Sequence, residues 1–160
     1  MTTDTIFDLA SLTKPIVTST LVMRLIDEGK LSADDPVYKH LPEFATDDDE
    51  KRHITVGQLL LHTSGLIADN AMSDYHDGPE RARERLLALR PTTSPGTRFV
   101  YSDVGFMVLG LLVERIEKRS LDVVAPNASS RRSACTRPVT RQATISVRGS
   151  PRPNAATTHG

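Results

Sequence analysis

Near the start of the chain, apolar side chains recur at helical spacing, at Ile16, Val17, Leu21, Leu25 and Ile26. Residues three, four and seven positions apart lie on one face of an α-helix, so the pattern predicts an amphipathic helix over residues 11–28. Pro15 fits the first turn of that helix, where a missing N–H breaks no bond. Gly29 is typical of the residue that ends a helix in the left-handed conformation.

The next stretch predicts shorter elements. Residues 31–53 show no sustained period and are expected to form a surface excursion with one short helical piece at 36–40. Thr55 and Gln58 have the spacing of a capping box, in which each side chain accepts a hydrogen bond from an N–H at the helix start. A short helix is therefore expected to run from this box to about His62.

Two further helices follow. A polar loop is expected at 69–78, and then a helix at 79–89, which has a proline in its first turn and a proline two residues after its end. The second long helix is predicted for 104–119, capped by Ser102 or Asp103. It follows a turn at 94–97 and a short extended piece at 99–101, so the predicted fold class is mainly α.

From about Val123 the chain changes character. The remainder is rich in Ser, Thr, Arg, Ala and Pro, has no Leu or aromatic residue, and shows no apolar period. Chains of this composition cannot bury enough apolar surface to offset their conformational entropy, so disorder is expected. The sequence thus predicts a mostly helical domain at 1–121 and a tail at 122–160. The abrupt change after Asp122 resembles a shift of reading frame.

Charge separates the same two parts. Residues 1–120 contain 14 Lys and Arg against 19 Asp and Glu, whereas residues 121–160 contain six Arg against Asp122 alone. Arginines without interleaved aromatic residues give only salt-sensitive, non-specific attraction to nucleic acid, so no specific nucleic-acid partner is expected.

Several functional classes find no support in the sequence. A single cysteine, Cys135, cannot form an intrachain disulfide. No apolar run reaches the ~20 residues of a membrane span, and no signal peptide is visible, which as the chain stands favours the cytoplasm. The histidines have no metal-ligand spacing, and there is no Rossmann or P-loop motif. No metal and no cofactor are therefore expected.

The candidate chemistry begins at Ser11 and Lys14. A serine three residues before a lysine at a helix start places a hydroxyl and an amine on one face, about one turn apart. A serine hydroxyl becomes a good nucleophile when a neighbouring group accepts its proton. Lys14 can accept that proton only if its pKa falls from about 10.4 towards neutrality.

The residues around this pair resemble those of a known family. The resemblance runs in order through residues 6–15, 21–31, 34–44, 54–66 and 95–103, which include Ser11-Leu12-Thr13-Lys14, His62-Thr63-Ser64-Gly65 and Tyr101-Ser102-Asp103. These motifs are similar to those of the serine β-lactamase-related family, which includes class C-type β-lactamases, penicillin-binding D-alanyl-D-alanine carboxypeptidases and related esterases. The resemblance covers about residues 4–121 and implies the helical subdomain of an α/β fold.

The resemblance also implies roles. Ser11 would attack the carbonyl of a β-lactam, a D-Ala peptide or an ester to form an acyl-enzyme, with Lys14 and Tyr101 moving the proton. Asp103 stands where the family's better-known form has Asn, and could either pair with Lys14 or cap the following helix. The His62 segment is expected to be a turn that fixes the local fold and not the nucleophile.

One motif of the family has no counterpart here. Members complete the site with a late strand that carries Lys-Thr-Gly or His-x-Gly, and the sequence after Asp103 offers neither. Members are also about twice as long as these 160 residues. The alternative interpretation is therefore a truncated, non-catalytic remnant of such an enzyme, whose uncovered apolar faces would favour self-association.

Overall fold

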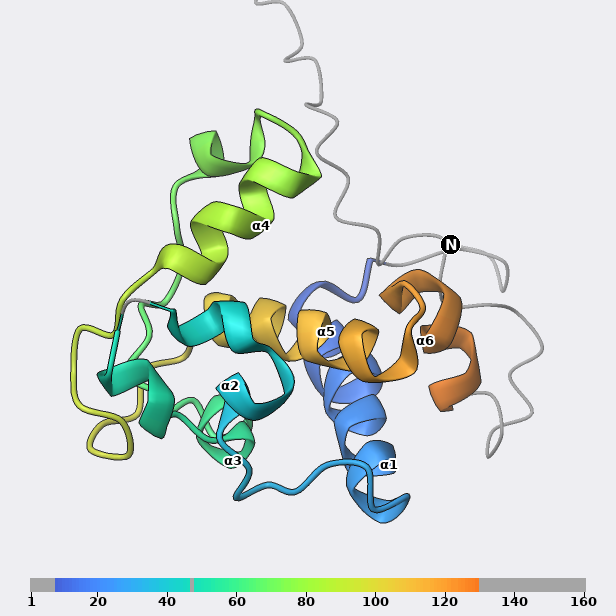
Figure 1. Cartoon of the computed structure of the whole chain (residues 1–160). Helices are drawn as coiled ribbons and strands as arrows, with labels where there is room; N and C mark the ends of the chain where they lie inside the picture. Colours follow the sequence, from blue (N-terminus) through green and yellow to red (C-terminus); the bar gives the residue numbers. More distant parts are fainter. Residues whose placement is uncertain (1–7, 47, 130–160) are drawn as a thin grey trace, which may run out of the picture.

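The computed structural model describes residues 8–46 and 48–129, which form an assembly of helices (Figure 1). In these residues there is no β-strand, and a single antiparallel bridge joins Pro36 to Thr55. The mainly α prediction is confirmed. In chain order, with η marking 3₁₀ and π segments, the helices are η1 (Ala10–Leu12), η2 (Lys14–Ser19), α1 (Thr20–Asp27), α2 (Val37–His40), η3 (Pro42–Ala45), η4 (Glu50–His53), α3 (Val56–Leu60), η5 (Met72–Tyr75), α4 (Pro79–Ala88), α5 (Asp103–Glu117) and α6 (Leu121–Ser129).

Helix α5 runs through the middle of the assembly and contacts α1, α2, α3, α4 and α6 (Figure 1). A helix that is apolar on most of its sides is stable in water only when neighbours cover it. Its buried apolar side chains are Val104, Phe106, Val108, Leu109, Leu112 and Val113. The helix ends where Lys118 adopts a left-handed φ of 54°. Because α5 is fixed from all these directions, the loop that leads into it is held as well.

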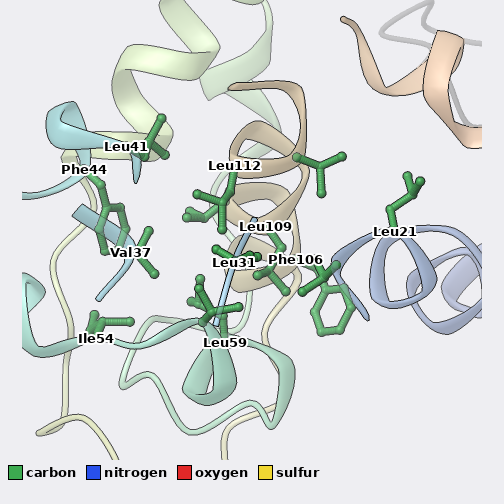
Figure 2. Close-up of a cluster of buried hydrophobic side chains, with 14 of the residues drawn as sticks. Leu21, Leu31, Val37, Leu41, Phe44, Ile54, Leu59, Phe106, Leu109 and Leu112 are labelled. Atoms are coloured by element: carbon green, nitrogen blue, oxygen red, sulfur yellow. The ribbon is translucent and has the colours of Figure 1, made fainter. Parts of the chain in front are cut away.

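The hydrophobic core lies between α5 and the helices on either side of it. Figure 2 shows Leu21 of α1 on one side of Phe106 and Leu109, and Val37, Leu41 and Ile54 on the other. Much of this core comes from residues 31–53, since Leu31, Val37, Leu41, Phe44 and Ala45 are buried. The expectation of a surface excursion there was wrong: α2 and η3 turn apolar side chains into the core, and η4 buries Lys51.

The first predicted helix is present, but it is not one regular helix. A 3₁₀ turn at η1 is followed by a π segment at η2 and then by the regular helix α1. Pro15 accounts for the break, because it has no N–H to donate to the carbonyl four residues earlier. The predicted end is confirmed: Gly29 has φ +67°, its N–H donates to Ile26, and the N–H of Lys30 donates to Leu25. This pair of bonds is the Schellman motif.

The other helices lie close to their predicted ranges. The Thr55–Gln58 capping box is confirmed, with Thr55 Oγ1 accepting from the Gln58 N–H at 3.2 Å and Gln58 Oε1 accepting from the Thr55 N–H at 3.0 Å. The expected loop at 69–78 also contains the short helix η5. In the described residues, no helix is both long enough and apolar enough to cross a membrane.

Helix α6 overturns part of the prediction for the tail. Residues 122–129 were expected to be structureless, yet they belong to a helix that contacts α1, α5 and η2. Val124 and Ala125 are each only 2% exposed. Docking of these side chains onto the core outweighs the poor helix propensity of a segment that contains Pro126. Residues 130–160, including Cys135, lie outside the described residues.

Candidate active site

Ser11 and Lys14 lie where η1 meets η2. Ser11 is the middle residue of η1 and Lys14 is the first residue of η2, so the chain completes about one turn between them. The Lys14 ammonium donates a hydrogen bond to Ser11 Oγ at 3.3 Å. The pairing predicted from the sequence spacing is therefore present. Ser11 itself is exposed, which leaves its hydroxyl open to an incoming carbonyl.

The backbone bends sharply just before Ser11. Ala10 has a positive φ of 44°, in the left-handed region that residues with a Cβ rarely occupy. The carboxylate of Asp8 holds this bend, because its Oδ1 accepts a hydrogen bond from the Ala10 N–H at 2.8 Å. Strained backbone of this kind costs of order 1–3 kcal/mol and clusters at functional sites.

The other half of the site comes from the entry to α5, about ninety residues later in the chain. Asp103 Oδ1 lies 2.6 Å from Lys14 Nζ, and the Tyr101 ring centroid lies 5.0 Å from the same ammonium. The four predicted site residues, Ser11, Lys14, Tyr101 and Asp103, are thus brought together around Lys14.

The two roles left open for Asp103 are now separated. Ser102 caps α5, since its Oγ accepts a hydrogen bond from the Gly105 N–H at 3.0 Å and donates one to the Ile67 carbonyl at 2.6 Å. Asp103 is the first residue of the helix and its side chain pairs with Lys14 instead. Its own N–H donates to the Ala68 carbonyl at 2.7 Å, which fixes the backbone that carries the carboxylate.

This arrangement decides the charge of Lys14. Partial burial acts to lower the pKa of Lys14, but hydrogen bonds and charge interactions with Asp103 and Tyr101 outweigh it and raise the pKa above its ordinary value of 10.5. The direction is opposite to the one that an amine base needs. Lys14 is therefore a cation at neutral pH, a donor to Ser11 rather than an acceptor.

Tyr101 is affected in the complementary way. Hydrogen bonding to Ser11, followed by that to Lys14, lowers the pKa of the Tyr101 phenol below its ordinary value of 10.0. A phenolate beside an ammonium group is stabilised by charge, and a lowered pKa makes the phenolate, the form that accepts a proton, more populated at a given pH. Of the two candidate bases, Tyr101 is the one whose environment favours the basic form.

His62 supports this arrangement from behind Tyr101. Its Nδ1 accepts a hydrogen bond from the Ser102 N–H at 2.9 Å, and its ring lies 4.5 Å from the Tyr101 ring and 5.0 Å from that of Phe106, centroid to centroid. Partial burial, with the nearby charge of Lys14, lowers the pKa of His62 below its ordinary value of 6.5. The neutral ring that Nδ1 needs as an acceptor is thus the favoured form.

The turn that contains His62 also holds the irregular segment of residues 96–100, just before Tyr101, by backbone hydrogen bonds. The Val100 N–H donates to the His62 carbonyl at 2.8 Å, and the Gly96 N–H donates to the Thr63 carbonyl at 2.7 Å. Gly65 has φ +80°, and a Cβ at that position would lie 2.0 Å from the Thr93 carbonyl oxygen, so only glycine fits. The expectation that the His62 segment is a turn that fixes the local fold is confirmed. The hydrogen bond from the Ser102 N–H to the His62 ring, across forty residues of chain, had no signal in the sequence.

In the part of the chain that the structure describes, His, Cys, Asp and Glu form no cluster of three or more that could hold a metal ion. The chemistry open to these residues is proton transfer and nucleophilic attack by a hydroxyl.

Comparison with known proteins identifies similar sequences. The family model described as Beta-lactamase matches residues 1–126. An N-acetylmuramyl-L-alanine amidase from Bacillus subtilis (strain 168) is 35% identical over 134 residues, which cover 77% of this chain and 30% of the amidase. Penicillin-binding protein 4 from Amycolatopsis lactamdurans is 36% identical over 125 residues, covering 76% of this chain and 32% of that protein. The chain therefore spans about a third of the length of these relatives.

Solved structures extend the similarity to the fold. A class C beta lactamase superposes with a TM-score of 0.63 at 28% sequence identity, over 73% of this chain and 32% of that one. A D-stereospecific amidohydrolase from Streptomyces sp. superposes with a TM-score of 0.58 at 32% identity, over 73% of this chain and 39% of that one. The described helices are thus the counterpart of one helical part of a larger fold.

Proposed function

Because this chain belongs to the Beta-lactamase family, of serine hydrolase type, we propose that it carries an acyl-transfer site in which Ser11 is the nucleophile. The observation that supports this most directly is the meeting of four polar side chains from two segments about ninety residues apart. Ser11 receives a hydrogen bond from Lys14, and Lys14 is held between Asp103 and Tyr101.

The proposed reaction follows from the charges of these groups. Ser11 Oγ attacks a carbonyl carbon while the hydroxyl proton passes to Tyr101, and the carbonyl π bond opens to place negative charge on oxygen. The tetrahedral intermediate collapses, the bond to the leaving group breaks, and that group takes a proton from Tyr101. Water then releases the acyl group from Ser11 by the same steps in reverse. The Lys14 cation stabilises the negative charge that develops next to it.

The substrate class is proposed from the relatives as well as from the site. The relatives named above include an amidase, a penicillin-binding protein, a class C beta lactamase and a D-stereospecific amidohydrolase. The terms amidase, lactamase and amidohydrolase in these names point to substrates with a carbonyl attached to nitrogen, and a serine that attacks such a carbonyl can also attack an ester. We therefore propose a β-lactam, a D-Ala peptide or a related ester as the substrate of Ser11.

Intact-mass spectrometry tests the nucleophile. The purified chain is exposed to a penicillin and, separately, to a fluorophosphonate, next to a Ser11→Ala variant and a control Ser73→Ala variant that alters another exposed serine. We expect one stoichiometric adduct in the wild type and in Ser73→Ala, and none in Ser11→Ala.

The alternative function makes the opposite prediction. A non-catalytic remnant would keep the helical fold, with a circular dichroism spectrum typical of helix, yet give no adduct with either reagent. That combination would overturn the proposed function, because a fluorophosphonate reacts with an activated serine even when the natural substrate of the site is unknown.

A further inference from the structure

We infer that Asp103 makes this site select substrates that carry a positive charge beside the carbonyl attacked by Ser11. The inference rests on the proposed function and adds a charge preference to it. It comes from the geometry of the ion pair between Lys14 and Asp103 and from which partner of that pair faces solvent.

The carboxylate is the exposed partner of the pair. The Lys14 side chain is 15% exposed, whereas that of Asp103 is 39% exposed. Asp103 Oδ1 is itself buried, so the exposed part of the side chain includes the other carboxylate oxygen. A carboxylate has about four acceptor positions on its two oxygens. After the contact with Lys14, Asp103 therefore keeps an outward-facing acceptor with negative charge.

Ser11 shares the Lys14 ammonium with this carboxylate. Lys14 Nζ is 3.3 Å from Ser11 Oγ and 2.6 Å from Asp103 Oδ1, so a single ammonium group separates the nucleophile from the carboxylate. An acyl group on Ser11 would place atoms two or three bonds from its carbonyl near Asp103. The Asp103 carboxylate therefore attracts or repels charge on these atoms of the substrate.

Lys14 offsets part of this negative charge, and the other groups around Ser11 do not. Asp8 adds a second exposed carboxylate three residues before the nucleophile, where its Oδ1 holds the Ala10 N–H. His62 faces the site through Tyr101, and the lowered pKa of its ring keeps it neutral near pH 7. Lys14 is positive, but most of its surface is covered.

The chemical consequence is a preference by charge. An ionised carboxylate can only accept hydrogen bonds, so it attracts a cation or an N–H donor and repels a carboxylate or a carbonyl oxygen. Two charges about 5 Å apart at an effective dielectric constant near 20 interact strongly enough to change a rate by tenfold or more. Solvent exposure reduces this effect, and we expect about a tenfold preference.

Two esters of the same shape measure the preference. The p-nitrophenyl esters of trimethylammonioacetate and 3,3-dimethylbutanoate differ in a nitrogen that replaces a carbon, and therefore in one positive charge. Attack by Ser11 forms the new C–O bond and expels p-nitrophenolate, and the hydroxyl proton goes to Tyr101. The rate of p-nitrophenolate release above that of Ser11→Ala is compared for the two esters.

The Asp103→Asn variant is the informative one, because it keeps the shape of the side chain and removes its charge. We expect the ratio of the rates, cationic over neutral ester, to fall about tenfold from wild type to Asp103→Asn. A general loss of activity from the broken Lys14 contact affects both esters and cancels in this ratio. Asp8→Asn removes an exposed carboxylate that does not pair with Lys14, and should lower the ratio by clearly less than Asp103→Asn does.

The outcomes separate the inference from the proposed function. If the fluorophosphonate labels Ser11 but the ratio is the same in wild type and Asp103→Asn, the charge preference is wrong and the nucleophile stands. If Ser11 takes no label and expels no p-nitrophenolate, both are overturned. An equal fall of the ratio in Asp8→Asn would assign the effect to overall charge and not to Asp103.

Discussion

At the scale of single residues, Lys14 is the centre of the site. Its ammonium touches the hydroxyl of Ser11, the carboxylate of Asp103 and the face of the Tyr101 ring. Because Asp103 holds Lys14 in its charged form, the hydroxyl proton needs another acceptor, and Tyr101 is the neighbour whose pKa is lowered. In the proposed reaction, Lys14 therefore supplies positive charge and Tyr101 accepts the proton.

The first prediction concerns the pH dependence of this acceptor. A base acts when it is deprotonated, so the rate at which fluorophosphonate labels Ser11 should rise with pH towards the lowered pKa of Tyr101 and level off below pH 10. Tyr101→Phe should remove this rise and slow labelling by roughly 100-fold or more. The measurement is the labelling rate by intact mass between pH 6 and pH 9.5. A rise that persists in Tyr101→Phe would assign the base to another group.

The second prediction concerns His62. Partial burial and the nearby charge of Lys14 lower the pKa of His62 in the folded state, so protonation favours unfolding. The neutral ring is also the form whose Nδ1 can accept the Ser102 N–H. The free energy of unfolding should therefore fall as the pH drops below 6.5, the value of a free histidine. His62→Asn tolerates the left-handed φ of 57° and should lack this dependence.

Urea unfolding of wild type and His62→Asn at pH 5.5 and pH 7.5 provides the measurement. We expect the wild type to lose more stability than the variant between the two pH values. The same loss in both proteins would mean that another group titrates. His62→Ala, which lacks both an acceptor and the ring contacts, should also slow the labelling of Ser11, because Tyr101 then loses its support.

At the scale of elements, the predictable parts are those with local signals. The Thr55–Gln58 capping box and the Gly29 helix end use contacts within a few residues, so the sequence spacing is enough to foresee them. The division of the first helix into 3₁₀, π and α turns is not foreseeable in this way, because the apolar stripe of Val17, Leu21 and Leu25 is compatible with any of them. Helix α6 depends on burial of Val124 against distant residues, and no local pattern reports that.

The site follows the same rule. The pair Ser11 and Lys14 is a local pattern, and its meeting with Tyr101 and Asp103 was expected from the family resemblance alone. The spacing along the chain cannot show whether the Asp103 carboxylate pairs with Lys14 or caps α5, since both contacts are chemically reasonable. In the structure the buried hydroxyl of Ser102 caps α5, which leaves the Asp103 carboxylate available to Lys14.

The third prediction concerns Lys51, which joins η4 to the end of α4. Its side chain is 3% exposed, its ammonium donates to the Leu87 carbonyl in the last turn of α4, and it lies 4.4 Å above the Phe44 ring. A cation at this end of a helix is favourable for the helix dipole. Burial nevertheless dominates and lowers the pKa of Lys51 from 10.5 to about 8.

The sign of the pH effect follows from that lowered pKa. Between about pH 8 and pH 10.5 the unfolded chain holds a proton on Lys51 that the folded chain has released, so the fold gains stability as the pH rises. Lys51→Met keeps the apolar stem and removes the titration. The difference in unfolding free energy, wild type minus Lys51→Met, should increase by on the order of 2 kcal/mol from pH 7.5 to pH 10. A constant difference would show that the amine is not desolvated.

At the scale of the whole molecule, the described helices form one connected core although the chain spans about a third of its relatives. Helix α5 contacts η2, which begins with Lys14, and also contacts α1 and α6. The residues just before α5 and at its start include Tyr101 and Asp103. Stability and site geometry are therefore coupled, because a change that loosens the packing around α5 also displaces Tyr101 and Asp103 from Lys14.

Shortened chains test this coupling and locate the end of the folded part. The composition of residues 130–160 predicts disorder, so a chain that ends at Ser129 should unfold within about 2 °C of the full chain. A chain that ends at Ser120 also loses α6, whose Val124 and Ala125 are each 2% exposed. Removing that buried apolar surface should cost roughly 2–4 kcal/mol and lower the unfolding temperature by several degrees.

Because α6 packs on η2, the segment that begins with Lys14, the loss should reach the nucleophile as well. Fluorophosphonate labelling of Ser11 is expected to slow in the chain that ends at Ser120 and to stay unchanged in the one that ends at Ser129, as measured below the unfolding temperature of both. Equal losses in the two shortened chains would place a stabilising contact beyond Ser129. No loss in the shorter chain would mean that α6 does not hold η2, and that the geometry of Ser11 and Lys14 depends on α1 and α5 alone.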